Sequence, residues 1–278
     1  TNFMKELKPD CLEDLIAGVS LYRPGPMDQI PRYISNKKDP DHAVYTHDSL
    51  KPILKVTYGC MVYQEQVMQI VRDLAGYSLG RADLVRRAMG KKKLEVMAKE
   101  REIFIHGQID ENGNIIVPGC VRNGIDEKSA NKIFDEMSEF AKYAFNKSHA
   151  ACYAFIAYQT AFLKAYYKTE FLTSLMVSDE ENMERIVMEV WECKSKWINV
   201  LPPSINESMK HFTYIDDKTI RFWLKAIKWI WDWPIEAIKS WRKEWKYIDL
   251  QDFVARAWKE VVNKKSLEAL ILSWSMDW

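Results

Sequence analysis

Five basic side chains lie within eight residues in the run Arg86-Arg87-Ala88-Met89-Gly90-Lys91-Lys92-Lys93. Arginine offers a planar fork of donors and lysine a compact charge, and the two together suit the oxygens of a triphosphate. A solvated basic face explains the same run, because cations are favoured near the C-terminus of a helix. From composition alone the solvated face is the better-supported explanation.

A second polar cluster, Asn146-Lys147-Ser148-His149, precedes a long apolar stretch. If a helix begins here, its free backbone N–H groups and its dipole favour an anion. An ordinary N-cap by Asn146 or Ser148 explains the cluster equally well. Ser148 and His149 do not form a nucleophile–base pair, because neighbours on a helix point in different directions.

The segment 63–69 (YQEQVMQ) reads as an amphipathic core helix whose polar members remain unassigned. The chain has no phosphate-binding glycine loop with lysine, no His-Glu-x-x-His and no dinucleotide fingerprint. Its one Asp-x-Asp, at Asp39 and Asp41, stands beside two lysines and predicts a solvated turn. The sequence therefore predicts no metal site in this chain.

Helical patterns dominate the elements that must position these residues. We predict helices at 12–22, 63–74, 79–89 with Ser78 as N-cap, 91–106, 127–140, 148–167 and 172–193, and again from 234 onward. Residues 28–56 are expected to be rich in loops. Residues 212–215 and 219–222 flank a polar turn and predict a β-hairpin. A domain boundary is expected near 178–200, where glycine usage, tryptophan usage and periodicity all change.

Composition limits the possible functions. The 278 residues carry a net charge of +1, so a nucleic-acid site must be a local patch. The five cysteines are scattered, which predicts free buried thiols in a reducing cytoplasm. No apolar run of membrane-spanning length and no signal peptide is visible. Because the chain begins at Thr1 without Met, we expect both ends to be cut from a longer protein.

Taken together, these motifs resemble the alpha subunits of bacterial DNA polymerase III, the C-family replicative polymerases. The motifs occur in the family's order and with family-like spacing over essentially the whole chain. The matching strings are LYRPGPM (21–27), TYG (57–59), YQEQVMQI (63–70), LAGYSLG (74–80), RRAMGKKK (86–93), FNKSHA (145–150) and LPPSIN (201–206).

The resemblance implies a mainly α fold. Residues 1–178 would form a helical fingers domain that grips the nucleotide and the primer–template. Residues 179–278 would form a small α+β region with a β-hairpin and a DNA-binding helix-hairpin-helix. In that region the family's hairpin corresponds to Trp229, Ile230 and Trp231, which are the implied DNA-binding residues.

The resemblance also changes the weight given to the two polar clusters. Arg86 and Arg87 match positions that contact the incoming triphosphate, and the same pocket is implied for Lys91, Lys93, Asn146, Lys147, Ser148 and His149. For Arg86, Arg87 and Lys147 the functional interpretation now outweighs the structural one. For Lys92 it does not.

The implied function is a share in a DNA-directed DNA polymerase, a nucleotidyltransferase of DNA replication. The chain would bind dNTP and primer–template DNA, while palm aspartates N-terminal to it hold the two Mg²⁺ ions. This chain alone is therefore expected to be inactive and to contain no catalytic residue. The sliding clamp and other replisome subunits would bind outside it, in the cytoplasm and without a membrane. The alternative is a non-catalytic DNA-binding paralogue.

Glycine and tryptophan usage departs from the family. All ten glycines lie at or before Gly124, and all eleven tryptophans at or after Trp191. At a usual frequency of roughly 7%, the residues after Gly124 should include about eleven glycines. Seven tryptophans stand where the family carries glycine, between residues that match well: Trp197, Trp223, Trp229, Trp231, Trp233, Trp245 and Trp274.

Two explanations remain open for these tryptophans. Hairpin glycines let backbone N–H groups approach a DNA phosphate, whereas indole rings would block that approach and expose apolar surface. We favour the hypothesis that the source organism reads UGA as glycine, while this sequence was translated with UGA as tryptophan. The competing explanation is a genuine tryptophan-rich tail that stacks on bases or on a partner. Trp191, Trp241, Trp258 and Trp278 fit the codon hypothesis less clearly, and Ala144 stands where glycine is common.

Overall fold

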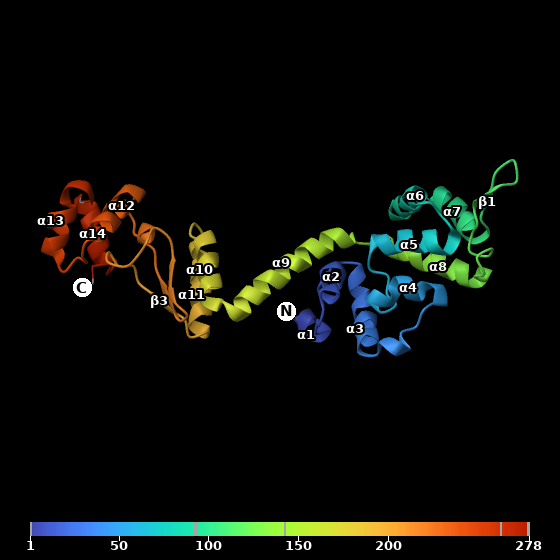
Figure 1. The fold of residues 1–278 in the computed structure, drawn as a ribbon, viewed down its shortest axis with the longest axis horizontal. Helices are drawn as coiled ribbons and strands as arrows, with labels where there is room; N and C mark the ends of the chain where they lie inside the picture. Colours follow the sequence, from blue (N-terminus) through green and yellow to red (C-terminus); the bar gives the residue numbers. More distant parts are fainter. Residues whose placement is uncertain (1, 92–93, 142, 262, 277–278) are drawn as a thin grey trace. The chain divides into compact units, whose positions relative to one another are not determined.

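A computed structural model describes residues 2–91, 94–141, 143–261 and 263–276. Its described elements are mostly helices, with two small sheets (Figure 1). This confirms the predicted mainly α fold. The chain divides into two compact units, residues 1–158 and 159–278. Across the described residues we find no helix with both the length and the apolar character needed to span a membrane.

The first unit is built almost entirely from helices. They are α1 (Asn2–Leu7), α2 (Leu12–Leu21), η1 (Pro26–Gln29), α3 (Ile30–Lys38), η2 (Pro40–His42), η3 (Asp48–Leu50), α4 (Lys51–Leu54), η4 (Lys55–Thr57), α5 (Gln64–Ala75), α6 (Leu79–Gly90), α7 (Leu94–His106), α8 (Glu127–Phe140) and the first part of α9 (Lys147–Tyr166). Strands β1 (Gln108–Ile109) and β2 (Ile115–Val117) form an antiparallel pair.

The predicted helices of the first unit are confirmed, and Ser78 caps α6 by accepting a hydrogen bond from the Arg81 N–H. The expectation of a loop-rich segment at 28–56 was wrong for α3. Apolar Ile30, Tyr33 and Ile34 follow helical spacing and pack in one core. The prolines and lysines that flank this short pattern obscured it.

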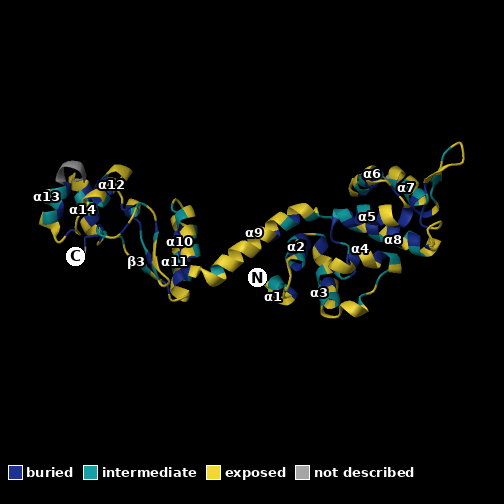
Figure 2. Cartoon of the chain, in the orientation of Figure 1, coloured by how far each residue is buried: buried dark blue, intermediate teal, exposed yellow. Residues whose placement is uncertain are grey.

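Two apolar clusters hold the first unit together. One cluster contains residues from each of the helices α4, α5, α6, α7 and α8, and it includes Val67, Ile70 and Phe134, which are fully buried. In Figure 2 the buried residues follow the inward faces of α5 and α8. The other cluster joins α2, α3 and the starts of α5 and α9, with Tyr33 and Tyr63 among its members. Each buried large side chain contributes about 1.5–3 kcal/mol of transfer free energy.

Two backbone segments cross closely at Gly107 and Gly119. A Cβ on Gly107, where φ is +85°, would lie 2.3 Å from the Pro118 carbonyl oxygen. A Cβ on Gly119 would lie 2.3 Å from the Gly107 nitrogen. The Cys120 N–H donates to the Phe104 carbonyl oxygen at 2.8 Å, which holds the crossing together. Neither glycine can therefore accept a side chain without movement of the backbone.

We expect Gly107→Ala to lower the free energy of unfolding by at least about 2 kcal/mol, because of the left-handed φ and the backbone clash. Urea denaturation measures the change. Gly80→Ala is the matched control, since a Cβ at Gly80 in α6 meets no atom within 4 Å and alanine favours helix. Equal losses in the two variants would contradict the crossing as the cause.

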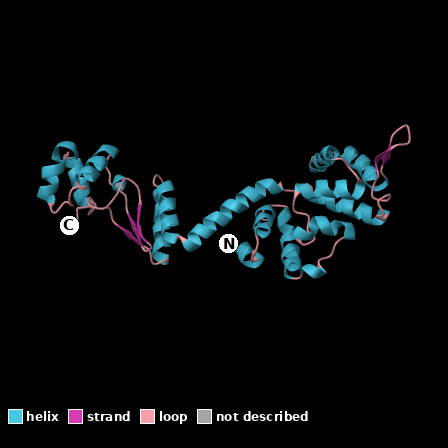
Figure 3. Ribbon diagram, in the orientation of Figure 1, coloured by secondary structure: helices cyan, strands magenta, loops and turns pink. Residues whose placement is uncertain are grey.

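The second unit combines helices with a small sheet (Figure 3). It contains the rest of α9, α10 (Lys168–Ser178), α11 (Met183–Ser195), β3 (Asn199–Leu201), β4 (Thr213–Asp216), β5 (Thr219–Arg221), η5 (Leu224–Ala226), α12 (Asp232–Trp241), α13 (Leu250–Val261) and α14 (Lys264–Leu272). The predicted hairpin is β4–β5, and β3 pairs with β5 in parallel. One core lies between α10, α11 and this sheet, and another between α12, α13 and α14.

The position of the functional boundary stays a prediction. The sequence favoured a boundary after residue 178, at the end of α10. In the structure α10 packs on α11 and on β4, within the second compact unit. The boundary between two compact units and the boundary between two functional domains need not fall at the same residue.

The five cysteines are all free thiols, as predicted. Cys60, Cys120 and Cys193 are buried, whereas Cys11 and Cys152 are exposed. The expected burial was therefore wrong for two of them. Cys11 precedes α2 as its N-cap residue, and Cys152 lies on an exposed face of α9.

A buried carboxyl pair stands out in the second unit. Glu189 on α11 is 6% exposed, and its Oε2 meets no hydrogen-bond donor among the described residues. Burial, followed by the hydrogen bond and charge of neighbouring Asp179, raises the pKa of Glu189 to about 7. The carboxyl group therefore stays protonated in the folded chain well above its ordinary pKa.

We expect the stability of the chain to fall as the pH rises from about 4.5 to about 7, because the folded state holds a proton that the unfolded state releases. Glu189→Gln should remove this part of the slope and stabilise the chain at pH 8 by on the order of 2 kcal/mol. Urea denaturation at pH 5 and pH 8 tests this, with Glu184→Gln on the exposed face of α11 as control. An unchanged slope in Glu189→Gln would contradict it.

Candidate nucleotide-binding site

The start of α5 holds the start of α9. The Gln64 N–H donates to the Phe145 carbonyl oxygen at 2.9 Å, and Gln64 Nε2 donates to the Ala144 carbonyl oxygen at 3.0 Å. Gln66 Oε1 accepts from the Tyr63 N–H at 3.0 Å and so caps α5. Polar side chains that the sequence left unassigned therefore fix the junction of two helices distant in sequence.

Arg86, on α6, reaches this junction. Its Nη1 donates to Gln64 Oε1 at 3.0 Å, and its Nη2 donates to Asp83 Oδ1 at 2.7 Å. Arg87 Nε pairs with Asp83 Oδ2 at 2.7 Å. The hydrogen bond from Arg86 contributes most, and together with the bond from Arg87 it holds the pKa of Asp83 below its ordinary value. One ionised carboxylate therefore keeps two guanidinium groups side by side.

The start of α9 already receives an anion. The Glu65 carboxylate oxygens accept from the Lys147 N–H at 3.0 and 3.1 Å, and Oε1 accepts from Asn146 Nδ2 at 2.7 Å. Asn146 Oδ1 accepts from the His149 N–H at 2.8 Å, so Asn146 is the residue that caps the helix. The anion expected at this helix terminus is thus the side chain of Glu65.

The side chain of Lys147 returns toward α2. Its Nζ lies 3.0 Å from Glu13 Oε1 and 5.3 Å from the centre of the Tyr63 ring. Glu13 Oε2 and the Tyr63 hydroxyl are buried and lack a hydrogen-bond partner among the described residues. Burial, together with the charges of Glu13 and Glu65, raises the pKa of Tyr63. The two groups that contact the ammonium group of Lys147 therefore each carry one unsatisfied polar atom.

The structure connects some of the predicted residues and not others. The guanidinium group of Arg86 donates to Gln64, and the backbone N–H of Lys147 donates to Glu65. Gln64 and Glu65 are consecutive residues of α5. Lys91 is exposed where α6 ends, and Ser148 is exposed on α9. The His149 ring lies 5.3 Å from the ring of Phe145. Lys93 lies outside the described residues.

Several residues of this cluster were missed by the sequence reasoning. Asp83 stands three and four residues before the two arginines, and this helical spacing is a signal that could have revealed it. Arg23, whose guanidinium lies 4.3 Å from the centre of the Phe145 ring, belongs to a matching string but was assigned no role. Glu13 gave no local signal, since its partner Lys147 is 134 residues away.

Among the described residues, one group of three could in principle hold a metal ion: Asp10, Cys11 and Asp14. Asp14 accepts hydrogen bonds from Lys37 Nζ at 2.6 Å and from the Tyr33 hydroxyl at 3.3 Å. Burial would raise the pKa of Asp14, but the hydrogen bonds to Lys37 and Asp10 together outweigh it and the pKa is lowered. A compensated carboxylate beside a thiol does not fit Mg²⁺, which requires several free oxygen ligands.

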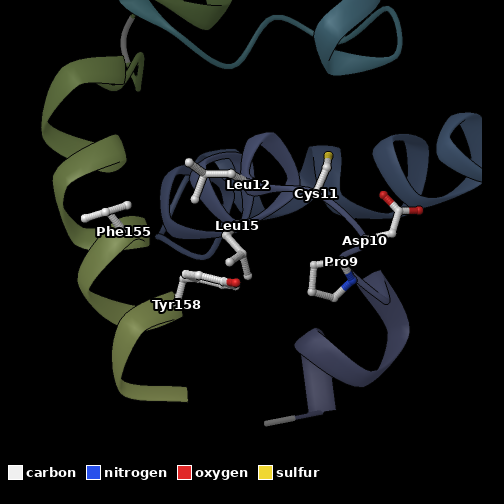
Figure 4. Close-up of a pocket in the computed structure, with 7 residues that line it drawn as sticks. All are labelled: Pro9, Asp10, Cys11, Leu12, Leu15, Phe155 and Tyr158. Carbon is white, nitrogen blue, oxygen red and sulfur yellow. The ribbon is translucent and has the colours of Figure 1, made fainter. Parts of the chain in front are cut away.

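A hollow of about 400 Å³ lies beside this group (Figure 4). Figure 4 shows the side chains of Leu15 in α2 and Tyr158 in α9 facing one another across it. The lining residues are mostly apolar: Pro9, Asp10, Cys11, Leu12, Leu15, Phe155 and Tyr158. A wall of this kind does not suit phosphate oxygens, so we separate the hollow from the cluster around Arg86.

The implied DNA-binding hairpin lies before α12. Ile230 is buried in the core of α12–α14, so its side chain packs inward. Trp229 and Trp231 are exposed and line a hollow of about 310 Å³ together with Asn263, Lys264 and Lys265. The Lys228 and Lys265 ammonium groups lie 5.3 and 5.2 Å from the centre of the Trp229 ring. A chain that is nearly neutral overall needs a local basic patch of this kind in order to bind nucleic acid.

Comparison with known proteins gives a consistent result. Residues 1–112 match the family model of the bacterial DNA polymerase III alpha subunit finger domain, and residues 197–277 match a helix-hairpin-helix motif. The DNA polymerase III subunit alpha of Vibrio cholerae is 45% identical over 99% of the chain, and that of Escherichia coli K12 is 44% identical over 99%. That of Neisseria meningitidis serogroup A is 47% identical over 95%.

The chain spans 23% of the length of the first two of these relatives and 22% of the third. Both family models fall on the segments for which the sequence motifs implied them. The order of the two matches, finger domain and then helix-hairpin-helix, agrees with the mainly α first unit and the mixed second unit. The chain is therefore homologous to the finger and helix-hairpin-helix region of the bacterial DNA polymerase III alpha subunits.

Proposed function

We propose that this chain is the part of a replicative DNA polymerase that holds the incoming dNTP and the primer–template DNA. The observation that carries the proposal is the convergence of Arg86 and Lys147 on consecutive residues of α5, Gln64 and Glu65. The guanidinium group of Arg86 and the backbone of Lys147, from two helices far apart in sequence, are thereby fixed to one short segment. A triphosphate carries several negative charges and needs cations from more than one direction.

The contribution of these residues to the reaction is positioning and charge stabilisation. Arg86 is held in a fixed orientation by Asp83 and Gln64, so its free donor directions are set before a ligand arrives. Lys147 supplies a compact ammonium charge for the same phosphates. The Mg²⁺ ions that would activate the primer hydroxyl would be held by palm residues outside this chain. This chain alone should therefore be inactive.

DNA contacts are assigned to the second unit. Lys228, Lys264 and Lys265 surround the hairpin at Trp229 and provide charge for the phosphate backbone. The sliding clamp and other replisome subunits would bind regions outside this chain, and the enzyme would act in the cytoplasm. A main replicase and an error-prone relative fit the proposal equally.

Binding of dNTP by the full-length protein, with primed template and Mg²⁺ supplied, tests the proposal. We expect saturable binding that is lost when the template is omitted. A non-catalytic paralogue would bind DNA without incorporating nucleotide, and an intact pair of palm aspartates upstream separates it from the polymerase. A helical scaffold would show no salt-dependent binding to primed DNA in a filter titration. Failure to bind dNTP would refute the proposal.

A further inference from the structure

Left-handed backbone conformation falls on tryptophan in this chain. Among the described residues other than glycine, five have a positive φ: Lys8, Tyr58, Trp197, Trp229 and Trp274. Only a few per cent of non-glycine residues adopt such angles, and large side chains do so least. At that frequency, eleven tryptophans in the chain should give fewer than one case.

Two of the three tryptophans end helices in the position that favours glycine. After α11, the Trp197 N–H donates to the Lys194 carbonyl oxygen at 3.2 Å and the Ile198 N–H to that of Cys193 at 3.0 Å. This is the hydrogen-bond pattern of a Schellman motif, whose left-handed residue is usually glycine. The left-handed residue here is Trp197, with φ of +62°.

The end of α14 repeats this pattern. The Trp274 N–H donates to the Ile271 carbonyl oxygen at 3.1 Å, and the Ser275 N–H to that of Leu270 at 3.3 Å. Trp274 has φ of +58°. In the first unit the corresponding positions after α5 and α7 are Gly76 and Gly107, with φ of +77° and +85°. The same chain thus ends helices with glycine in one unit and with tryptophan in the other.

The third tryptophan lies in the hairpin. The Ile230 N–H donates to the Ile227 carbonyl oxygen at 3.1 Å, which makes Trp229 the third residue of a tight turn. Its φ is +72°, as in a type II turn, where that position is occupied by glycine. Both Lys228 and Lys265 lie against the Trp229 ring, so the indole occupies the space above the turn.

Solvent exposure agrees with the backbone. Trp197 is 87% exposed and Trp274 is 72% exposed, so neither ring packs in a core that would compensate a left-handed φ. Trp223 differs, since it is buried against Phe212 and has φ of −88°. Trp231 also has a negative φ, of −95°. Backbone conformation therefore singles out three of the seven positions.

We infer that residues 197, 229 and 274 are glycine in the protein that its own cell makes, and that the codon rendered here as tryptophan is read there as glycine. A one-base change separates UGA from the glycine codon GGA. If UGA is read as glycine in the cell and as tryptophan in the printed sequence, tryptophan replaces glycine and the neighbouring residues stay the same. The same cause accounts for three of the glycines that are missing after Gly124. The hairpin backbone at 229 is then free of its indole and open to the surrounding lysines.

Peptide masses from the protein purified from its own cells decide the matter. Cleavage after Lys196, Lys228 and Lys265 places the three positions in separate peptides. We expect each peptide to be lighter than the printed sequence requires by at least the difference between tryptophan and glycine. The coding DNA should carry TGA at all three positions. Full tryptophan masses, or TGG codons at these positions, would overturn the inference.

The conformational premise has its own test in the recombinant chain. The triple variant Trp197→Gly, Trp229→Gly, Trp274→Gly should raise the Tm by roughly 5 °C or more over the printed sequence, because strain is relieved at three sites. Trp191→Gly is the control: Trp191 is exposed and lies inside α11, where glycine disfavours the helix, so the Tm should fall. A triple variant that melts below the printed chain would overturn the premise.

Discussion

Arg86→Ala in the full-length polymerase is expected to raise the KM for dNTP and to lower turnover, reducing kcat/KM by about 100-fold. Arg86 donates three hydrogen bonds, to Asp83 and Gln64, and its side chain is 21% exposed. Its position is therefore fixed before nucleotide binds. Loss of a preorganised donor weakens the transition state more than the ground state, which is why turnover falls as well.

Comparison with Arg87 separates position from charge. Arg87 is 63% exposed and keeps one ion pair, to Asp83. Its replacement by alanine removes the same charge but a less constrained donor, so we expect a smaller loss, mainly in KM. Arg86→Lys retains the charge and loses the planar fork, and should recover only part of the activity.

Arg72→Ala is the matched control. Arg72 is an arginine of α5 that is also paired with an aspartate, Asp73, but it lies at the far end of the helix from Gln64. Its replacement should leave kcat and KM unchanged. Steady-state kinetics with a primed template measure all four variants. Wild-type kinetics in Arg86→Ala would refute the assignment of this residue to the nucleotide site.

Much of the fold was predictable because it depends on local signals. Serine before α6 has a fixed role at the start of a helix, and it was predicted correctly. The hairpin β4–β5 followed from alternation around a polar turn. The helix α3 was missed because its nine residues include Pro31, Lys37 and Lys38 and carry too few apolar positions to reveal their period.

The candidate site was predictable in its residues but not in its connections. Family-like strings pointed to Arg86 and Lys147, each of which had an equally ordinary explanation as a helix-end residue. The structure adds a pair of contacts, to Gln64 and to Glu65, which join α6 and α9 to the start of α5. Such contacts depend on tertiary packing, and no periodicity in a single sequence encodes them.

The tryptophan positions show the opposite case, in which composition anticipated a backbone property. Missing glycine in the second half of the chain implied that some turns there lacked their usual residue. The positive φ at Trp197, Trp229 and Trp274 identifies those turns. Trp223 shows why composition alone was insufficient, because that position matches a family glycine yet has an extended backbone and a buried ring.

Lys147→Ala is expected to reduce kcat/KM for dNTP by about 100-fold, through loss of the ammonium group that would meet the phosphates. In the structure that group is paired with Glu13 at 3.0 Å. A nucleotide must therefore compete with Glu13 for Lys147. Because the pair is partly exposed, its contribution is modest, and Glu13→Gln should lower the KM by roughly two- to fivefold.

A double-mutant cycle isolates this competition. If Glu13 acts through Lys147, then Glu13→Gln should have no effect on KM once Lys147 is alanine. Lys164→Ala is the control, since Lys164 is another α9 lysine paired with a glutamate, Glu192, and belongs to the second unit. If Glu13→Gln lowers the KM equally in the wild-type protein and in Lys147→Ala, Glu13 acts independently of Lys147. In that case the contact at 3.0 Å would be a structural ion pair, and Lys147 would reach the nucleotide without having to leave it.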